Sequence, residues 1–377
     1  LYDALVELVP HPGDSATRST ADWESELQKR RGALLLVVED NAINQEVTTQ
    51  LLAEVGMETR VAGNGQIAVD MVRKQRYDLI LMDIQMPVMD GFQATAAIRA
   101  LPAGRDVPIL AMTANAFAED RRRCLEAGMN DHVPKPVEPR KLYEQLVKWL
   151  PVRGSGARES GRFSRAGAVS DRQKAQLAAL SAVEGLDTEA GLMTLQGDIG
   201  HYLRLLGQFA DQHSNDGAAM AADVAAGNLK SVQYTAHSLK GVAATLGALQ
   251  VAGLAANAET LAKTGQRGED WRPLLDSLAA ELGTLTAALT ALLADEEEER
   301  PSELPPAVDI AVVRAVLSRL ETLLEASDTV ANDLIEEYGN LLRHELGAAF
   351  PVLEKQIEDF DYGDALVTLR TALTMRN

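Results

Sequence analysis

Short apolar runs and longer amphipathic stretches alternate along residues 33–150. The short runs, such as ALLLVV, DLILM and VPILAM, are bounded by turn residues, and stretches such as NQEVTTQLLAEVG lie between them. The short runs have the length of buried strands and the longer stretches have the spacing of helices. Because this alternation is typical of a parallel sheet covered on both faces, we predict an α/β domain over residues 33–150.

The rest of the chain has helical periodicity. Residues 171–294 are dominated by Ala and Leu, which predicts an antiparallel helix bundle. Residues 307–377 are again periodic and predict a C-terminal helical domain, whose role is either docking or dimerisation, or that of a cap on the bundle. The apolar spacing in residues 1–9 predicts a helix, which we interpret as the end of a preceding, truncated domain.

Three polar segments between these units are predicted to be linkers. Residues 10–32 open with two prolines and a glycine, and residues 151–170 are rich in Gly, Ser and Arg. Residues 295–306 combine an acidic run with prolines. A chain of 377 residues exceeds what one hydrophobic core usually serves, so several domains are expected.

Composition and charge narrow the classes of function. The formal net charge of -19 would repel nucleic-acid phosphates and anionic lipid, so we expect no nucleic-acid partner. Apolar residues make up 46% of the chain, yet no run approaches the roughly 20 needed to cross a bilayer, so we expect no membrane insertion. Cys124 is the only cysteine, which suits a reducing cytoplasm.

Polar residues that carry chemistry follow four of the predicted strands. Glu39 and Asp40 follow ALLLVV, Asp83 follows DLILM, Thr113 follows VPILAM, and Lys135 follows NDHVP. The carboxyl ends of parallel strands converge on one crevice, so these side chains are expected to lie together. Three neighbouring acids repel one another unless a hard cation neutralises them, which predicts a Mg²⁺ site.

The motifs VVEDN, DLILMDIQMPVMDG, AMTANA and VPKP, in this order and spacing, resemble the response-regulator receiver domain. The resemblance implies a flavodoxin-like, doubly wound parallel sheet of strand order 2-1-3-4-5 and a cis peptide before Pro136. It also implies that Asp83 is the phosphoacceptor. The magnesium ligands would be Glu39, Asp40, Asp83 and the backbone carbonyl of Gln85. The switch residues would be Thr113, Lys135 and His132, of which His132 stands in a position that is usually aromatic. Taken singly, each residue is better explained as a helix cap, a turn residue or a surface charge, and only the five matches in this order favour the functional interpretation. For Asn41 and Asn44 helix capping is the better interpretation.

A second candidate site lies in the predicted bundle. The segment TAHSLKGVAATLGAL has two faces at helical spacing. The apolar face consists of Leu239, Val242, Leu246 and Leu249. The opposite face consists of His237, Lys240, Gly241 and Ala244. We therefore predict a solvent-facing His237 that attacks phosphorus without an adjacent activating base. HSLKGVAATLGA, followed by LAANAETLA, resembles the histidine phosphotransfer (Hpt) domain, which implies that His237 is phosphorylated and that Lys240 and Gly241 support the phosphohistidine. His201 and His213 are predicted to lie on a helix without partners.

Together the two domains resemble the C-terminal part of an unorthodox hybrid sensor histidine kinase. This implies a phosphorelay in a two-component system, from an upstream kinase histidine to Asp83, then to His237, then to a downstream response regulator. The upstream kinase domain would belong to the same parent chain or to a dimer partner, and the fragment would be the cytoplasmic part of a membrane-bound bacterial sensor. The chain has no recognisable ATP-binding module. A phosphorylation-independent scaffold is the alternative, whereas an aspartyl-phosphate hydrolase would need an acid where Gln85 stands.

Overall fold

The computed structural model describes residues 20–113, 118–152, 170–265, 271–293, 310–326, 328–358 and 361–374. The predicted helix in residues 1–9 lies outside the described residues. So do most of the linkers predicted at 151–170 and 295–306.

The α/β domain contains a five-stranded parallel sheet in the order β2-β1-β3-β4-β5, which confirms the predicted topology. The strands are β1 (Leu34–Val38), β2 (Glu58–Ala62), β3 (Leu79–Asp83), β4 (Ile109–Thr113) and β5 (Asp131–Pro134). The helices are α2 (Ala42–Glu54), α3 (Gly65–Lys74), α4 (Gly91–Arg99), α5 (Ala118–Glu126) and α6 (Pro139–Trp149). Successive strand residues point to opposite faces, so Leu35 and Val37 share a core with α2 and α6, while Leu36 and Val38 share one with α3 and α4.

One helix precedes the sheet where a linker was predicted. Within residues 10–32, α1 (Thr20–Gln28) packs against α6, and its Leu27 is fully buried. Just after α1, the Arg30 guanidinium donates to the carbonyl oxygens of Leu150 (2.9 Å) and Val147 (3.2 Å). The linker prediction was wrong here because it rested on the prolines and glycine at positions 10–13, which precede α1 and do not interrupt it.

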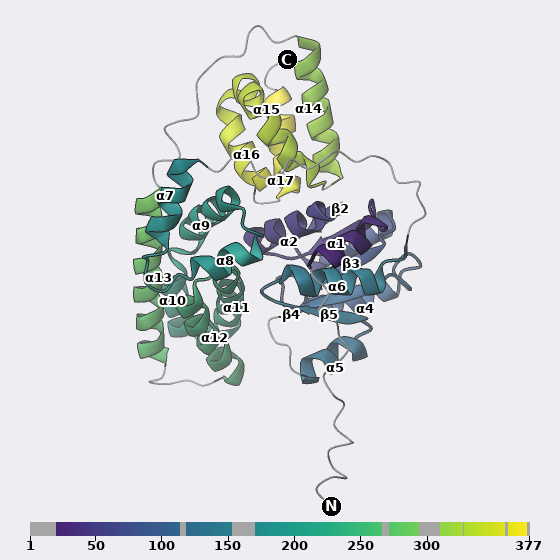
Figure 1. Cartoon of the computed structure of the whole chain (residues 1–377). Coiled ribbons are helices and arrows are strands. Elements are labelled where there is room, and N and C mark those ends of the chain that lie inside the picture. Colours follow the sequence, from purple (N-terminus) through teal and green to yellow (C-terminus); the bar gives the residue numbers. More distant parts are fainter. Residues whose placement is uncertain are drawn as a thin grey trace, which may run out of the picture.

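The central bundle comprises seven helices of the described chain and lies beside the α/β domain (Figure 1). They are α7 (Asp171–Leu180), α8 (Thr188–Thr194), α9 (Ile199–His213), α10 (Asp216–Ala226), α11 (Leu229–Thr245), α12 (Leu249–Thr264) and α13 (Trp271–Leu293). Leu239, Val242 and Leu246 are buried in its core as predicted, but Leu249 is 52% exposed. Helical spacing fails at Leu249 because the chain turns at Gly247 (φ 83°) and a new helix begins.

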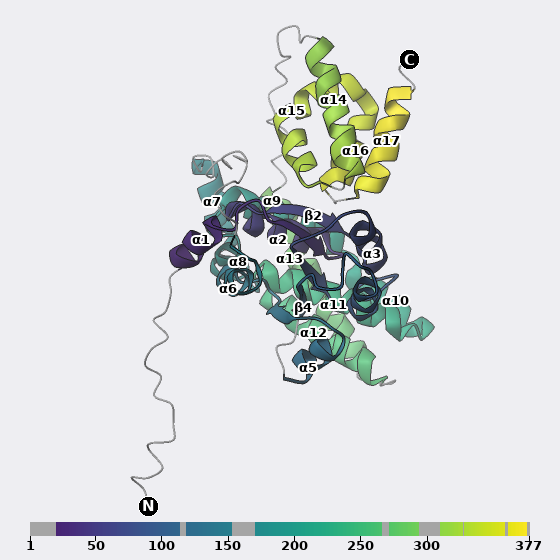
Figure 2. The same ribbon diagram turned by 90° about the vertical axis from the view of Figure 1, so that its right-hand side faces the viewer.

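The C-terminal bundle has a core of its own. It consists of α14 (Ile310–Glu325), α15 (Val330–Leu346), a 3₁₀ turn (Gly347–Ala349), α16 (Phe350–Glu358) and α17 (Tyr362–Thr374). In Figures 1 and 2 it lies next to the β2 side of the sheet. Arg60 on the edge strand β2 forms an antiparallel bridge and a 2.7 Å ion pair with Asp328, and the hydroxyls of Thr59 and Thr329 are 2.9 Å apart. The bundle therefore docks on the sheet edge through polar contacts.

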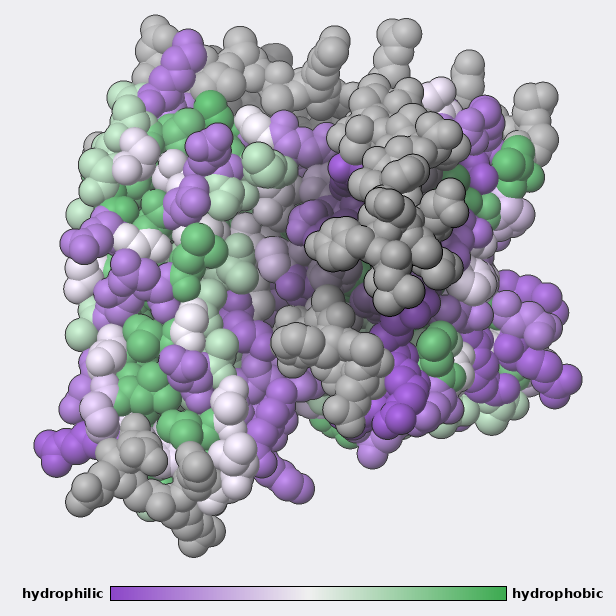
Figure 3. All heavy atoms as spheres, turned by 60° about the horizontal axis from the view of Figure 1, so that its bottom comes forward, coloured by the Kyte–Doolittle hydropathy of each residue, from purple (hydrophilic) through white to green (hydrophobic). Residues whose placement is uncertain are grey.

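The surface view in Figure 3 shows hydrophilic and hydrophobic residues intermixed over the central bundle, and mostly hydrophilic residues over the α/β domain. Among the described residues, no helix combines the length and the apolar character that a membrane span requires.

Candidate functional site

Three acids meet at the carboxyl edge of the sheet. Glu39 and Asp40 directly follow β1, and Asp83 is the last residue of β3, so the adjacent parallel strands bring them together. One carboxylate oxygen from each lies within 4.8 Å of the others. Burial raises the pKa of Glu39 to about 8 and also raises the pKa of Asp40, and repulsion from Asp83 adds to both shifts. This set of hard carboxylate oxygens, of which those of Glu39 and Asp83 are buried, fits a divalent cation, which would offset the repulsion.

Lys135 supplies a positive charge to the same cluster. Its Nζ is 2.6 Å from Glu39 Oε2 and 2.8 Å from Asp83 Oδ2, and its side chain is 7% exposed. Burial lowers the pKa of Lys135, but the two carboxylates raise it by more, so the ammonium stays charged. The peptide bond before Pro136 is cis, as the resemblance implied.

The other candidate residues of the α/β domain lie on or directly after the neighbouring strands. Thr113 ends β4 and is buried, and its carbonyl oxygen accepts from the Lys135 amide at 2.7 Å. The amide of Gln85 donates to Asp83 Oδ1 at 3.3 Å. His132 lies within β5, with Nδ1 3.4 Å from Asp131 Oδ1. The switch roles of Thr113 and His132 stay predictions.

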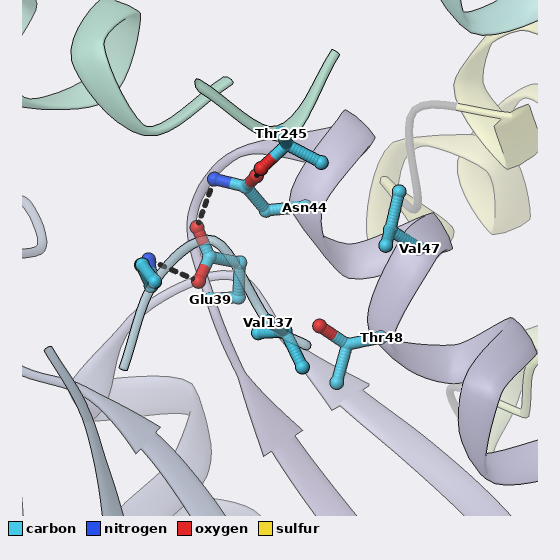
Figure 4. A pocket seen from close by; sticks show the side chains of 7 residues that line it. Glu39, Asn44, Val47, Thr48, Val137 and Thr245 are labelled. Atoms are coloured by element: carbon cyan, nitrogen blue, oxygen red, sulfur yellow. Dashed lines mark hydrogen bonds and ion pairs between the residues drawn. The ribbon is translucent and has the colours of Figure 1, made fainter. Parts of the chain in front are cut away.

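A cavity of about 10 Å³ lies beside Glu39, close to the space of one water molecule (Figure 4). Asn44 Nδ2 donates to Glu39 Oε1 at 3.1 Å, and Thr245 Oγ1 donates to Asn44 Oδ1 at 3.3 Å. Because Thr245 belongs to α11, this chain of hydrogen bonds leads from the acid cluster of the α/β domain into the central bundle.

His237 lies on α11 but is only 8% exposed, so the prediction of a solvent-facing imidazole was wrong. Its Nδ1 is 3.0 Å from Glu259 Oε1 on α12. Lys240 and Lys263 each bind the same carboxylate at 2.5 Å. Burial raises the pKa of Glu259, but the contacts with His237 and the two lysines lower it by more, to well below its usual range. The prediction also missed Glu259, although this residue lies in the segment LAANAETLA.

Helix α11 packs against α2 of the α/β domain, which explains the burial of its polar face. The Tyr234 hydroxyl donates to Asp40, and Asn41 Nδ2 donates to Ser238 Oγ at 3.3 Å. Asn41 also caps α2, as predicted, by accepting from the Asn44 amide. Burial and the neighbouring Asp40 raise the pKa of Tyr234 above its usual value, so its hydroxyl remains a donor. The two candidate sites are thus brought together at one interface.

Comparison with known proteins agrees with the division of the chain into an α/β domain and a central bundle. The model of the family described as response regulator receiver domain matches residues 35–147, and that of the Hpt domain matches residues 204–299. The chain therefore contains a receiver domain and an Hpt domain. They correspond to the α/β domain and to the central bundle.

The chain is similar to curated sensor kinases. The chain is 31% identical over 292 residues to the sensor histidine kinase GacS of Pseudomonas protegens, a match covering 76% of the chain and 30% of that relative. It is 34% identical over 158 residues to BarA of Escherichia coli K12, a match that covers 42% of the chain and 17% of BarA. The receiver domain is 47% identical in sequence to that of sensor histidine kinase PA1611 of Pseudomonas aeruginosa. The match covers 31% of this chain and 97% of that solved structure, with a TM-score of 0.30. The chain spans less than a third of these curated relatives.

The interface between the receiver and Hpt domains includes contacts away from the acid cluster. Glu46 on α2 is 2.7 Å from His201 Nε2 and also pairs with Arg204, both on α9. Gln196 of the Hpt domain donates to the Tyr143 hydroxyl at 2.7 Å. His201 was predicted to lack a partner, and so was His213, which contacts Asp216 at 2.7 Å. Periodicity identifies the helix of a histidine but not the acid that another element brings to it.

Proposed function

We propose that this chain carries two successive steps of a phosphorelay: phosphorylation of Asp83 by an upstream kinase histidine, then transfer to His237. The observation that supports it best is the packing of α11 over the acid cluster, with Tyr234 bound to Asp40. On this proposal the chain is the cytoplasmic part of a longer sensor kinase, and His237 passes the phosphoryl group to a downstream receiver.

In the first step the P–N bond of the donor phosphohistidine breaks while an Asp83 carboxylate oxygen bonds to phosphorus. The product is an acyl phosphate, and the released imidazole keeps the electron pair of the broken bond. Lys135 Nζ, 2.8 Å from Asp83, is close enough to balance the charge of the phosphoryl oxygens. Mg²⁺, held by Glu39, Asp40, Asp83 and the Gln85 carbonyl, would supply further positive charge at the same oxygens.

In the second step Nε2 of His237 attacks the phosphorus, the P–O bond to Asp83 breaks, and the carboxylate is restored. An ionised Glu259 can only accept hydrogen bonds, so the 3.0 Å contact assigns a proton to Nδ1 of His237. In the neutral ring this leaves the lone pair on Nε2. Lys240, bound to Glu259 Oε2 at 2.5 Å, would supply positive charge to the phosphohistidine, and Gly241 lies beside Asn44, where an added Cβ would be 3.6 Å from Nδ2.

Water is a weak competitor in this scheme. A hydrolase of aspartyl phosphate needs an acid two residues after the nucleophile to move the leaving-group proton. Gln85 occupies that position and cannot serve as an acid. Slow hydrolysis keeps the acyl phosphate available for transfer.

The test uses the full chain with ³²P-labelled acetyl phosphate and Mg²⁺. We expect label on both residues in wild type, only an acyl phosphate in His237→Gln, and no label in Asp83→Asn. Acyl phosphate and phosphohistidine are separated by their opposite stabilities in base and acid. Label on His237 in Asp83→Asn, or an unlabelled His237 in wild type, would contradict the relay. A scaffold without phosphorylation would take up no label at all.

A further inference from the structure

The receiver and Hpt domains share a charged contact that includes none of the proposed phosphoryl-transfer residues. Glu46 on α2 lies against α9, where Oε1 is 2.7 Å from His201 Nε2 and bound to the Arg204 guanidinium. The Glu46 side chain is 13% exposed and the His201 side chain 6% exposed. The contact between Glu46 and His201 is therefore largely withdrawn from water, whereas the Arg204 side chain is 47% exposed and its charge is screened more strongly.

Burial alone would make this position unfavourable for a carboxylate. Burial raises the pKa of Glu46, but His201 and Arg204 lower it by more, to about 2. Arg204, which donates to Glu46, and His201, whose Nε2 lies 2.7 Å from it, thus offset the desolvation of this acid on the other domain. An uncharged side chain in its place would leave His201 buried without its acidic partner.

We infer that His201 and Arg204 form a recognition site for a carboxylate on the helix of a partner receiver that corresponds to α2, and that this site selects the receivers with which His237 exchanges phosphate. This inference rests on the proposed function and names its partner: a receiver with an acid where Glu46 stands on α2. Glu46 of the same chain occupies the site when the two domains are docked. When they separate, a downstream receiver with an acid at the position of Glu46 occupies it instead. Because both use one surface, the two receivers exclude each other.

The position of the site fits selection better than catalysis. Glu46 follows the capping residue Asn41 by five positions along α2, and His201 and Arg204 belong to α9, whereas His237 belongs to α11. The pair can therefore vary in charge without altering the acid cluster or the imidazole. Complementary charges at an interface favour the correct partner and penalise like charges in a wrong one.

The test is a charge swap in the full chain, again with labelled acetyl phosphate and Mg²⁺. Loading of Asp83 and transfer to His237 are followed separately. We expect Glu46→Arg and Arg204→Glu each to slow transfer by about 10- to 100-fold. The double variant E46R/R204E restores the pair and should recover to within about threefold of wild type. Glu46→Gln, which keeps the shape, should fall between wild type and Glu46→Arg.

Partner selection is tested between chains. Asp83→Asn, phosphorylated on His237 with phosphoramidate, is the donor, and His237→Gln, with either Glu46 or Glu46→Arg, is the acceptor. We expect the donor to prefer the acceptor with Glu46, and a donor that also carries Arg204→Glu to prefer the acceptor with Glu46→Arg. Glu138→Arg and Arg272→Glu are matched controls, because both residues are exposed and each forms its ion pair with a neighbour in its own domain, Lys141 or Asp276.

The outcomes separate this inference from the relay itself. If wild type labels His237 and Glu46→Arg labels it at the same rate, the recognition site is refuted while the relay stands. Failure of the double variant to recover, with thermal unfolding like that of wild type, refutes it as well. A wild type that never labels His237 instead refutes the proposed function.

Discussion

Glu259 is expected to orient His237 for attack on phosphorus. Replacing Glu259 with Ala removes the acceptor 3.0 Å from Nδ1 and leaves two lysines without their shared acid. A hydrogen bond to a charged group is worth about 1.5–3 kcal/mol. If the whole of that is expressed in the transition state, phosphoryl transfer to His237 slows by about 10- to 100-fold. Stability should fall by about 2–4 kcal/mol, mainly through His237 and Lys240, because the Lys263 side chain is 40% exposed.

The assay separates orientation from a general loss of structure. Transfer from Asp83 to His237 is timed in the full chain, and long-range ¹⁵N NMR of the imidazole reports which nitrogen carries the proton. We expect a proton on Nδ1 in wild type and a mixture of tautomers in Glu259→Ala. Glu259→Gln keeps an acceptor oxygen and should recover most of the rate. Glu138→Ala is the control, because Glu138 is an exposed acid paired with Lys141.

A Glu259→Ala variant that transfers within twofold of wild type would show that Glu259 does not orient His237. An unchanged tautomer would show the same, because the carboxylate would then have no influence on the nucleophile. A loss of rate that Glu259→Gln does not rescue, with both variants folded, would assign the effect to the charge at Lys240 and not to the proton on Nδ1.

Three further outcomes are expected. Lys135→Met removes the cation beside Glu39 and should slow labelling of Asp83 by acetyl phosphate about 10²- to 10³-fold, as measured by intact mass; an unchanged rate would exclude Lys135 from the chemistry. The pKa of Glu259 in the folded protein is lowered from 4.5, so the ionised Glu259 stabilises the fold fully above pH 4.5 and progressively less as the pH falls below it. The difference in unfolding free energy between wild type and Glu259→Gln, measured with urea, should therefore narrow below pH 4.5. A difference that stays constant with pH would contradict this expectation. Asp328→Arg should speed hydrogen exchange at β2 by releasing the C-terminal bundle, and the second change Arg60→Asp should restore slow exchange. Equal exchange in wild type, the single variant and the double variant would show that the Arg60–Asp328 ion pair does not hold the bundle.

The acid cluster was predictable from the sequence because its geometry follows from the sheet alone. Runs such as ALLLVV and DLILM identify parallel strands, and such strands end at one edge. The residue that follows each run is therefore placed to within a few ångström without any knowledge of long-range packing. That reasoning correctly brought Glu39, Asp83 and Lys135 together.

The surroundings of His237 were not predictable in the same way. Periodicity assigned His237 to the polar face of α11, and a polar face normally meets water. Here that face meets α2 of another domain, and nothing in the spacing of α11 encodes the arrival of Asn41 or Asn44. Glu259 was equally hidden, because its partner lies 22 positions earlier on a different helix.

The burial of His237 bears directly on how a relay can operate. With His237 8% exposed and Asp83 2% exposed, neither group can meet a third protein while α11 rests on α2. The docked arrangement therefore suits only exchange between Asp83 and His237, and loading from a kinase or delivery to another receiver requires the two domains to part. The contacts that would have to break include polar side-chain pairs, such as Asn41 with Ser238, and apolar packing, because one cluster of buried apolar residues contains members of both domains.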